Sequence, residues 1–516
     1  MTSKIFKASP KIFANYKSAA PTQTVRNIQK ALEKTGISSD KLKYAGGKIG
    51  AGFSIYGGHV HYGQQYVAAG KGTTLQLSKA SALAETIERI PTNFSPLIPY
   101  LKLSADLETG STFNGYTRGE EKNIPNGIKI KSLFTHFPSI NIAEIKQRGI
   151  SQHWIDALSL IDNKYKKVPH VLIRDTIGSN GLAAGNTLEE AVSQAFCEVC
   201  ERHSLIDHVL KRMPAPTVDI KTIKDKAVLG AIEIFNSLNI SVKIKDLTMG
   251  NRFPTMGVLF TNHNLDHEKS TIKKKLFHKT LHAGSHLDLN QAILRCLVEE
   301  WQGGGFNPMV IMYHREFDLI DKYFSNKEKL KIISERKKNL LSLVVSGRSF
   351  DDYSQMDENE PEIPFSSLES YNTTDFLDDI EIIKKFSKKN SWEPLMVDYT
   401  IREFPLKIVR IIVPETVDDL YRCRYLSFPE KLKNFPDQKD PPLLKEYLRN
   451  ENKNTKELIT VAESNLIEGI INPTPKRQIF SEHSPVEMLN IIKNSYLELG
   501  DGMKCKQIEE LVNSLS

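Results

Sequence analysis

Three stretches of the chain place carboxylates and arginines at the spacing of one helix face. Their members are Ser81, Glu85, Glu88 and Arg89 in the first, Glu190, Glu198, Glu201 and Arg202 in the second, and Arg295 and Glu299 in the third. Residues three or four positions apart are neighbours on a helix, so each stretch forms a stripe. Carboxylates at that spacing repel each other, and Mg²⁺ compensates such charge when it bridges acids to substrate phosphates. The pattern therefore predicts metal-dependent phosphate chemistry.

The alternative reading of the E-x-x-E-R pattern is an ordinary solvated helix, on which Glu and Arg form weak local pairs. Here the pattern occurs twice, ending at Arg89 and at Arg202, and a third acidic helix follows. The residues between the acids are largely apolar, so these helices have surface to bury. We therefore favour a site at the edge of a buried face.

A small-residue run precedes the second acidic stretch. Thr187 is a predicted N-cap with Glu190 three positions later, which is the spacing of a capping box. Asn186 then projects where helix-terminal N–H donors gather, a position suited to a phosphate or a metal-bound water. The chain has no G-x-x-x-x-G-K-[ST] motif, so a P-loop is disfavoured.

Hydrophobic periodicity places these residues on helices over 24–36, 75–90, 187–210 and 290–302. Strands are predicted within 43–69, 240–260 and 406–413. Helices and strands mix without a regular βαβ rhythm, so the predicted fold class is α+β. The body is expected to span residues 1–419, followed by a proline-punctuated, mainly helical extension over 420–516.

Composition excludes several classes of protein. The 516 residues carry a net charge of +7 without clustered basic runs, so nucleic-acid binding is not expected. No uninterrupted run of eighteen apolar residues and no signal peptide occur, so neither a membrane span nor secretion is expected, and a cytoplasmic location is predicted. Cys197 and Cys200 form a lone C-x-x-C inside a helical pattern and are predicted to be buried thiols. The pairs His59 with His61 on a strand and His282 with His286 in a loop are predicted to be structural or surface residues.

The runs over residues 70–89, 179–202 and 284–302 resemble the three nucleotide-binding segments of the YcaO family, in the family's order, and residues 408–414 resemble its closing strand. The resemblance implies an ATP site without a P-loop, in which acidic helices hold Mg²⁺ ions. The implied metal ligands are Glu85, Glu88, Glu190, Glu198, Glu201 and Glu299. The implied nucleotide-binding residues are Lys17, Thr24, Ser81, Glu85, Arg89, Asn186, Arg202 and Arg295, with Arg202 and Arg295 also supplying catalytic charge. Thr24 stands where the family has serine.

The resemblance also implies an activity, because most members activate a backbone amide to form an azoline, a thioamide or an amidine. The implied substrate is a ribosomally made peptide or protein. The final residues, from Leu511 to Ser516, contain no proline, so a proline-rich tail is not expected, and neither is a precursor-binding segment ahead of Lys17. A separate partner resembling a ubiquitin-activating enzyme or TfuA is therefore expected to deliver the substrate, and a homodimer stays open. Two alternatives remain: a non-catalytic accessory protein, and a carboxylate-rich phosphohydrolase that works without ATP.

Overall fold

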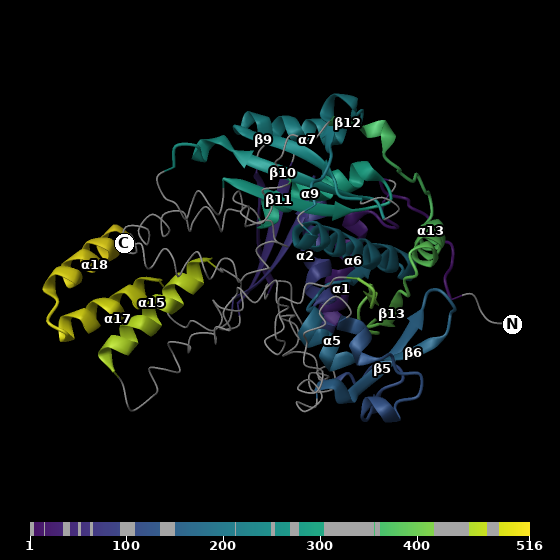
Figure 1. The fold of residues 1–516 in the computed structure, drawn as a ribbon, viewed down its shortest axis with the longest axis horizontal. Helices are drawn as coiled ribbons and strands as arrows, with labels where there is room; N and C mark the ends of the chain where they lie inside the picture. Colours follow the sequence, from purple (N-terminus) through teal and green to yellow (C-terminus); the bar gives the residue numbers. More distant parts are fainter. Residues whose placement is uncertain are drawn as a thin grey trace.

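Three sheets and a set of long helices form the body of the protein (Figure 1). The computed structural model describes residues 5–14, 16–34, 42–49, 53–61, 65–92, 109–134, 150–211, 213–248, 253–268, 278–303, 356, 362–416, 454–471 and 485–515. The mixture of helices and sheets confirms the predicted α+β class.

The sheets are built almost entirely from antiparallel pairs. The first is a meander of β1 (Leu42–Ile49), β2 (Phe53–His61) and β3 (Gln65–Gly72). The second, in the order β11-β10-β9-β8-β12, contains β8 (Thr217–Asp219), β9 (Ile240–Asp246), β10 (Thr255–Asn262), β11 (Lys279–Ser285) and β12 (Glu362–Pro364), the last pairing parallel to β8. The third, in the order β4-β5-β13-β14-β7, contains β4 (Thr117–Arg118), β5 (His153–Ser159), β7 (Leu182–Gly185), β13 (Leu395–Asp398) and β14 (Lys407–Ile412), and β6 (Tyr165–Pro169) pairs with β5.

The predicted acidic stretches are the helices α2 (Leu75–Glu88), α6 (Leu188–Lys211) and α9 (Leu289–Gly303), as expected. The other helices of the body are α1 (Pro21–Lys34), α5 (His170–Ile177), α7 (Lys226–Ser237) and α13 (Phe376–Lys389). Helix α6 packs on β7 and β14 of the third sheet and on β11 of the second, so it lies between them (Figure 1). Helix α2 packs on β2 and β3, and α9 packs on β10 and β11. The three helices therefore bring one face each toward the junction of the sheets.

The helix boundaries follow from local chemistry. The Thr74 hydroxyl accepts from the Leu77 N–H at 3.2 Å and starts α2, and the Thr187 hydroxyl accepts from the Glu190 N–H at 3.2 Å and starts α6. A capping box also needs a hydrogen bond from the Thr187 backbone N–H to the Glu190 carboxylate, and this part of the prediction is wrong. The carboxylate accepts hydrogen bonds from Ser18 and Asn186 instead.

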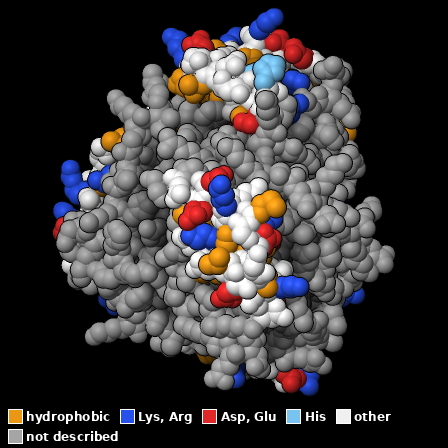
Figure 2. Space-filling model, turned by 90° about the vertical axis from the view of Figure 1, so that its left-hand side faces the viewer, with side chains coloured by type: hydrophobic (Ala, Val, Ile, Leu, Met, Phe, Trp, Pro, Cys, Tyr) orange, Lys and Arg blue, Asp and Glu red, His pale blue; other side chains and the backbone are white. Residues whose placement is uncertain are grey.

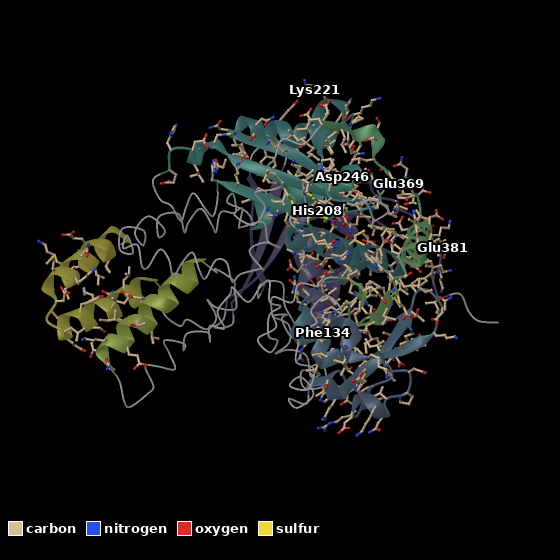
Figure 3. All side chains as sticks on the ribbon, in the orientation of Figure 1. Phe134, His208, Lys221, Asp246, Glu369 and Glu381 are labelled. Carbon is tan, nitrogen blue, oxygen red and sulfur yellow. The ribbon has the colours of Figure 1, made fainter. Side chains whose placement is uncertain are left out.

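Apolar side chains of α6 fill the space between the sheets. Phe196 is fully buried and meets Phe253 edge-on at 5.2 Å between ring centroids. Cys197 and Cys200 are buried free thiols, as predicted, and burial raises the pKa of Cys197 to about 12. In Figure 3, His208 on α6 is buried inside the body, whereas Glu381 on α13 is exposed at its edge.

Glycines allow the strand before α2 to approach that helix closely. A Cβ atom at Gly70 would lie 2.0 Å from the Ser78 carbonyl oxygen, and one at Gly72 would lie 2.6 Å from the Leu77 Cβ. Both glycines face α2, so Lys71 between them points to the opposite side of β3, because side chains alternate along a strand. Gly181, before β7, has φ +67°, a conformation that glycine adopts without strain.

The predicted position of His282 in a loop is wrong. His282 lies on β11 rather than in a loop, and its Nε2 is 2.8 Å from the buried Glu300 carboxylate. The Thr280 hydroxyl donates to the same carboxylate at 2.7 Å. His282 is thus a structural histidine, as the sequence predicted, and it fastens α9 to the second sheet. His59 and His61 lie on β2, as expected, and their side chains are outside the described part of the structure.

The C-terminal part contains α15 (Thr455–Ile471), α17 (Pro485–Glu498) and α18 (Gly502–Leu515), and α17 packs on both of the others. Figure 2 looks onto this unit and shows acidic, basic and apolar side chains interspersed on it. The predicted boundary of the extension near residue 419 lies outside the described residues. No helix in the described ranges is both long and apolar enough to cross a bilayer.

Candidate functional site

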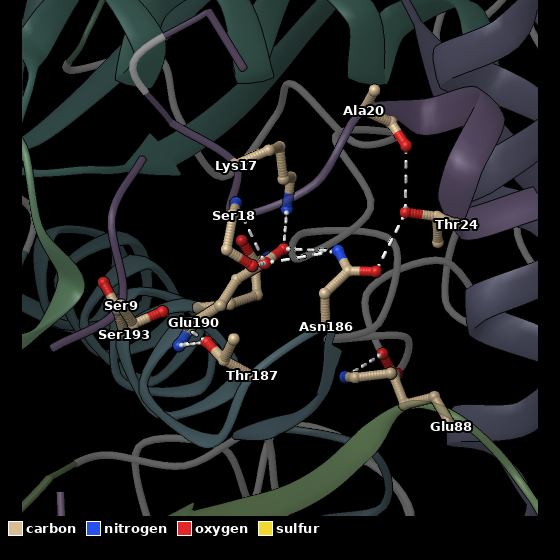
Figure 4. A network of polar contacts seen from close by, with 12 residues as sticks. Ser9, Lys17, Ser18, Ala20, Thr24, Glu88, Asn186, Thr187, Glu190 and Ser193 are labelled. Carbon is tan, nitrogen blue, oxygen red and sulfur yellow. Dashed lines mark hydrogen bonds and ion pairs between the residues drawn. The ribbon is translucent and has the colours of Figure 1, made fainter. Parts of the chain in front are cut away.

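Residues from two distant parts of the chain form one polar network at the start of α6 (Figure 4). The Lys17 ammonium lies 3.2 Å from the Glu190 carboxylate, and the Ser18 backbone N–H donates to the same carboxylate at 3.2 Å. Asn186 Nδ2 donates to Glu190 Oε2 at 3.3 Å, and the Thr24 hydroxyl donates to Asn186 Oδ1 at 2.9 Å. The structure therefore brings together four residues that the sequence predicted separately, with Ser18 as an addition.

Glu190 is the centre of this network. Its side chain is 3% exposed. Burial works to raise the pKa of Glu190, but the charge of Lys17 and the hydrogen bonds from Ser18 and Asn186 hold it below its ordinary value. The carboxylate is therefore ionised at neutral pH, and it fixes the orientation of Lys17 and Asn186.

A second group of charges lies along the facing sides of α2 and α6. Arg89 pairs with Glu85 at 3.0 Å, and its Nε lies 3.9 Å from Glu88. The Ala184 N–H, on β7, donates to Glu88 at 3.3 Å and ties the acid of α2 to the strand before α6. Ser81 lies half-buried on α2, one turn before Glu85.

Burial is the main influence on the pKa values of the acids in this group. Burial raises the pKa of Glu88 to about 8, against the attraction of Arg89, and the charges of Glu198 and Glu85 add to the rise. Burial also raises the pKa of Glu198, and Glu201 adds to that rise while Arg202 opposes it. Glu88 lies on α2 and Glu198 lies on α6. The charge of Glu198 raises the pKa of Glu88, so the two carboxylates lie near each other.

Arg295 reaches from α9 to α6. Its Nη1 donates to Gln194 Oε1 at 2.9 Å, and its Nη2 lies 3.5 Å from Glu201. Arg202 Nε lies 3.9 Å from the other oxygen of Glu201. The Arg295 Nε is buried and has no hydrogen-bond partner among the described residues. An unsatisfied buried donor beside several acids is available to an anionic ligand.

Lys71 joins the third helix to this group. Its ammonium contacts the Glu299 carboxylate of α9. Burial lowers the pKa of Lys71 to about 8, the positive charges of Arg295 and Arg202 lower it further, and Glu201 opposes them. A lysine held between acids and arginines with a lowered pKa is a candidate phosphate contact.

Sequence reasoning did not assign Ser18, Lys71 or Gln194 to the site. Gln194 lies four positions from Glu190 and four from Glu198, so helical spacing alone would have placed it on the same face. Lys71 lies between two glycines, a pattern that the close packing of β3 on α2 explains. Ser18 follows Lys17 directly, and no sequence pattern indicates that it belongs to the site.

The residues present fit Mg²⁺ and a nucleoside triphosphate. Among the described residues, no group of three or more His, Cys, Asp or Glu side chains is arranged to hold a metal ion. Mg²⁺ usually takes one or two carboxylates and completes its shell with phosphate oxygens and water. Glu88 and Glu198 are carboxylates whose pKa values burial raises, which suits a bound cation, and the buried Nε of Arg295 suits a phosphate oxygen.

Comparison with known proteins identifies a family. Residues 69–417 match the family model described as YcaO cyclodehydratase, ATP- and Mg²⁺-binding. An uncharacterised protein of Methanothermobacter thermautotrophicus is 23% identical over 67% of this chain and 81% of its own length. The ribosomal protein S12 methylthiotransferase accessory factor YcaO of Escherichia coli is 26% identical over 48% of this chain, and the match spans 43% of that protein.

Two solved structures share the fold. The YcaO of Methanopyrus kandleri, bound with AMPPCP and Mg²⁺, superposes with a TM-score of 0.54 at 18% identity over 82% of this chain and 99% of its own. A heterocyclase in complex with substrate and cofactor gives a TM-score of 0.57 at 18% identity over 80% of this chain, and this chain spans 54% of the heterocyclase. The family model covers well over half of the sequence, and the fold agrees with it, so the protein belongs to the YcaO family of ATP- and Mg²⁺-binding proteins.

Proposed function

We propose that this protein uses Mg·ATP to phosphorylate the oxygen of a peptide-backbone amide, so that a nucleophile replaces that oxygen. The product is an azoline or a thioamide in a ribosomally made peptide or protein. The observation that carries the proposal is the convergence of acids from α2 and α6 with Arg295 of α9, beside the network of Lys17, Asn186 and Glu190.

The chemistry requires an activated oxygen, because an amide oxygen is a poor leaving group. The amide oxygen attacks the terminal phosphorus of ATP, the bond to the bridging oxygen breaks, and ADP leaves. A thiol or hydroxyl of the substrate, or external sulfide, attacks the amide carbon, and inorganic phosphate leaves with the original amide oxygen. Such a transfer needs positioning and compensation of charge more than covalent catalysis by the protein.

The residues divide this work between them. Bound Mg²⁺ neutralises charge on the phosphates. Glu85, Glu88, Glu198, Glu201 and Glu299 are proposed to hold it. Glu190, which the sequence implied as a metal ligand, has Lys17 and Ser18 as direct partners and is instead proposed to position them in the half of the site that takes the base and ribose. Lys17, Thr24 and Asn186 are proposed to contact the base and ribose, and Ser81 and Arg89 to line the phosphate half. Arg202 and Arg295 supply fixed positive charge to the transferred phosphoryl group.

The peptide and its delivery are part of the proposal. The heterocyclase with the same fold was solved in complex with its substrate and cofactor. For this chain we propose a peptide substrate presented by a separate partner that resembles a ubiquitin-activating enzyme or TfuA. The test is turnover with the peptide and partner encoded nearby. ATP consumption should require Mg²⁺, and the peptide mass should change by about −18 Da for an azoline or about +16 Da for a thioamide, as set by loss or replacement of the activated oxygen.

A non-catalytic role is the second candidate, because the E. coli relative is named an accessory factor. Acids persist on all three helices and remain grouped with arginines, which favours a working site. An accessory protein would bind its partner without consuming ATP in the presence of Mg²⁺ and peptide.

The pH dependence of nucleotide binding follows from two shifted groups. Glu88 has a pKa raised to about 8 and must lose its proton to hold a metal ion, so affinity should rise as the pH increases toward 8. Lys71 has a pKa lowered to about 8 and loses its positive charge above that pH, so affinity should then fall. Titration calorimetry with a Mg-bound non-hydrolysable analogue between about pH 6 and 9 should show a maximum near 8, and a flat profile would contradict both assignments.

Truncation tests the predicted domain boundary. The helices α15, α17 and α18 pack on one another, and the nucleotide network draws on none of them. A chain that ends near residue 441 should therefore keep Mg·ATP affinity close to that of the full chain, as measured by calorimetry. Loss of folded protein on truncation would show that the extension is part of the core.

A further inference from the structure

The segment that carries Lys17 and Ser18 has a second attachment to the body, at a distance from the nucleotide network. We call residues 5–14 and 16–18 the N-terminal strap. The Ser9 hydroxyl lies 2.7 Å from the Thr187 hydroxyl at the start of α6. Figure 4 draws both residues beside the nucleotide network. Further along, the Phe13 N–H donates to the Lys17 carbonyl at 3.0 Å, and the Lys17 N–H donates back to the Phe13 carbonyl at 3.1 Å. The Phe13–Lys17 bonds form a turn within the strap. Its backbone is attached to the body before that turn, where the N–H groups of Lys7, Ser9 and Lys11 donate to Glu189, Asp375 and Thr374.

Lys11 is the anchor between these points. Its ammonium lies 2.9 Å from Asp379 on α13, and the two side chains are 2% and 1% exposed. It also donates to the Thr373 hydroxyl at 2.6 Å and lies 5.0 Å from the centre of the Phe376 ring. The other Asp379 oxygen accepts from the Ser193 hydroxyl of α6 at 3.0 Å. A fully buried ion pair of this kind depends on such additional hydrogen bonds to both partners.

The anchor and the nucleotide network meet the same face of α6. Glu190 binds Lys17 and Ser18, and Ser193, three positions later, binds the carboxylate that holds Lys11. Residues three apart are neighbours on a helix. The distance between the two attachments is therefore set by rigid elements, and it determines where Lys17 lies relative to Glu190.

We propose that the buried Lys11–Asp379 pair is a remote positioning element of the nucleotide site: it fixes the N-terminal strap so that Lys17 and Ser18 reach Glu190. The inference rests on the proposed nucleotide function and extends it to residues that contact no substrate. It concerns the base and ribose half of the site alone, because the direct partners of Lys17 and Ser18 belong to that half, whereas Arg295 and Arg202 converge on Glu201.

Removing the lysine charge should weaken the docking of the strap near Lys17 while leaving the body folded, because the backbone bonds at Lys7, Ser9 and Lys11 remain. In Lys11→Met, Asp379 keeps its hydrogen bonds from Ser193 and Thr373, both of which belong to the body. Ordering the strap then becomes a cost of binding adenosine. The apparent affinity for the nucleotide falls in proportion to the fraction of molecules in which the strap is docked. Tripolyphosphate uses only the phosphate half and does not bear that cost.

The experiment compares two probes by calorimetry in the full chain, Mg·AMP-PNP and Mg·tripolyphosphate. Lys11→Met should weaken AMP-PNP by about tenfold or more and leave tripolyphosphate within about twofold. Lys11→Arg, which keeps the charge, should restore AMP-PNP binding. Hydrogen exchange should speed up at the amides of Phe13 and Lys17 in Lys11→Met, and Asp379→Asn should give the same pattern from the other side of the pair.

Lys245→Met is the matched control, because Lys245 is also a fully buried lysine, bonded to Thr217 at 2.8 Å within the second sheet. This variant should lower the free energy of unfolding without changing the ratio of the affinities for AMP-PNP and tripolyphosphate. Equal losses for both probes in Lys11→Met, or unchanged AMP-PNP binding, would overturn the positioning role. A wild-type protein that binds neither probe would instead refute the proposed nucleotide function.

Discussion

Replacing Glu88 or Glu201 by alanine is expected to abolish Mg-dependent nucleotide binding. The two acids lie on different helices and join one charged group, Glu88 with Arg89 and Glu201 with Arg202 and Arg295. Loss of groups that only orient a metal ligand costs about 10–100-fold in metal affinity, so loss of a ligand should cost more than about 100-fold. Calorimetry with Mg·AMP-PNP measures the effect.

The control for these variants is Glu233→Ala, which removes an exposed helical glutamate of α7 at a distance from the charged group. It should bind nucleotide as the wild type does. The Glu88→Ala variant should remain folded, because a carboxyl whose pKa is raised to about 8 lowers the stability of the folded protein as the pH rises from its ordinary pKa through that value. Wild-type affinity in both Glu88→Ala and Glu201→Ala would contradict the metal assignment.

Replacing Arg295 by methionine should affect turnover more than binding. Arg295 is held by Gln194 and Glu201 with its Nε left buried, so its charge is in place before the reaction begins. Removal of one preorganised group that stabilises transition-state charge typically lowers kcat by about 10²–10³. We expect that loss in steady-state ATP turnover with peptide, with a smaller change in KM for ATP.

Two companion variants separate charge from orientation. Arg295→Lys should retain part of the rate because it keeps a positive charge but not the planar fork. Gln194→Leu removes the hydrogen bond at 2.9 Å that orients the guanidinium and should lower kcat without removing charge. An Arg295→Met enzyme with kcat within about threefold of the wild type would remove Arg295 from the catalytic role.

The helices and their acids could be predicted because they depend on local pattern. The cap Thr187 and the i, i+3 and i, i+4 spacing of the acids are properties of neighbouring residues. The same reasoning failed for the Glu190 carboxylate, which accepts from Ser18 and Asn186 rather than from the backbone N–H of its cap residue Thr187. A buried acid takes whichever donors tertiary packing brings to it, and a local motif carries no information about those donors.

The strap and Lys71 could not be predicted for a related reason. Lys11 and Asp379 lie 368 positions apart in the chain, and neither stands in a periodic segment that reveals its partner. Lys71 meets Glu299 only because β3 contacts both α2 and α9, an arrangement that depends on the fold. The resemblance identified the family and its acids, whereas these contacts are visible only in three dimensions.

Phosphorylation of an amide oxygen of the peptide is the central claim. Oxygen-18 placed in the target amide tests it most directly, with the full chain, its partner, Mg²⁺ and ATP. We expect each modified residue to release one labelled inorganic phosphate, detected by mass spectrometry, because the amide oxygen leaves on phosphorus. Label retained in the modified peptide, label released into water instead of phosphate, or modification without ATP would contradict it.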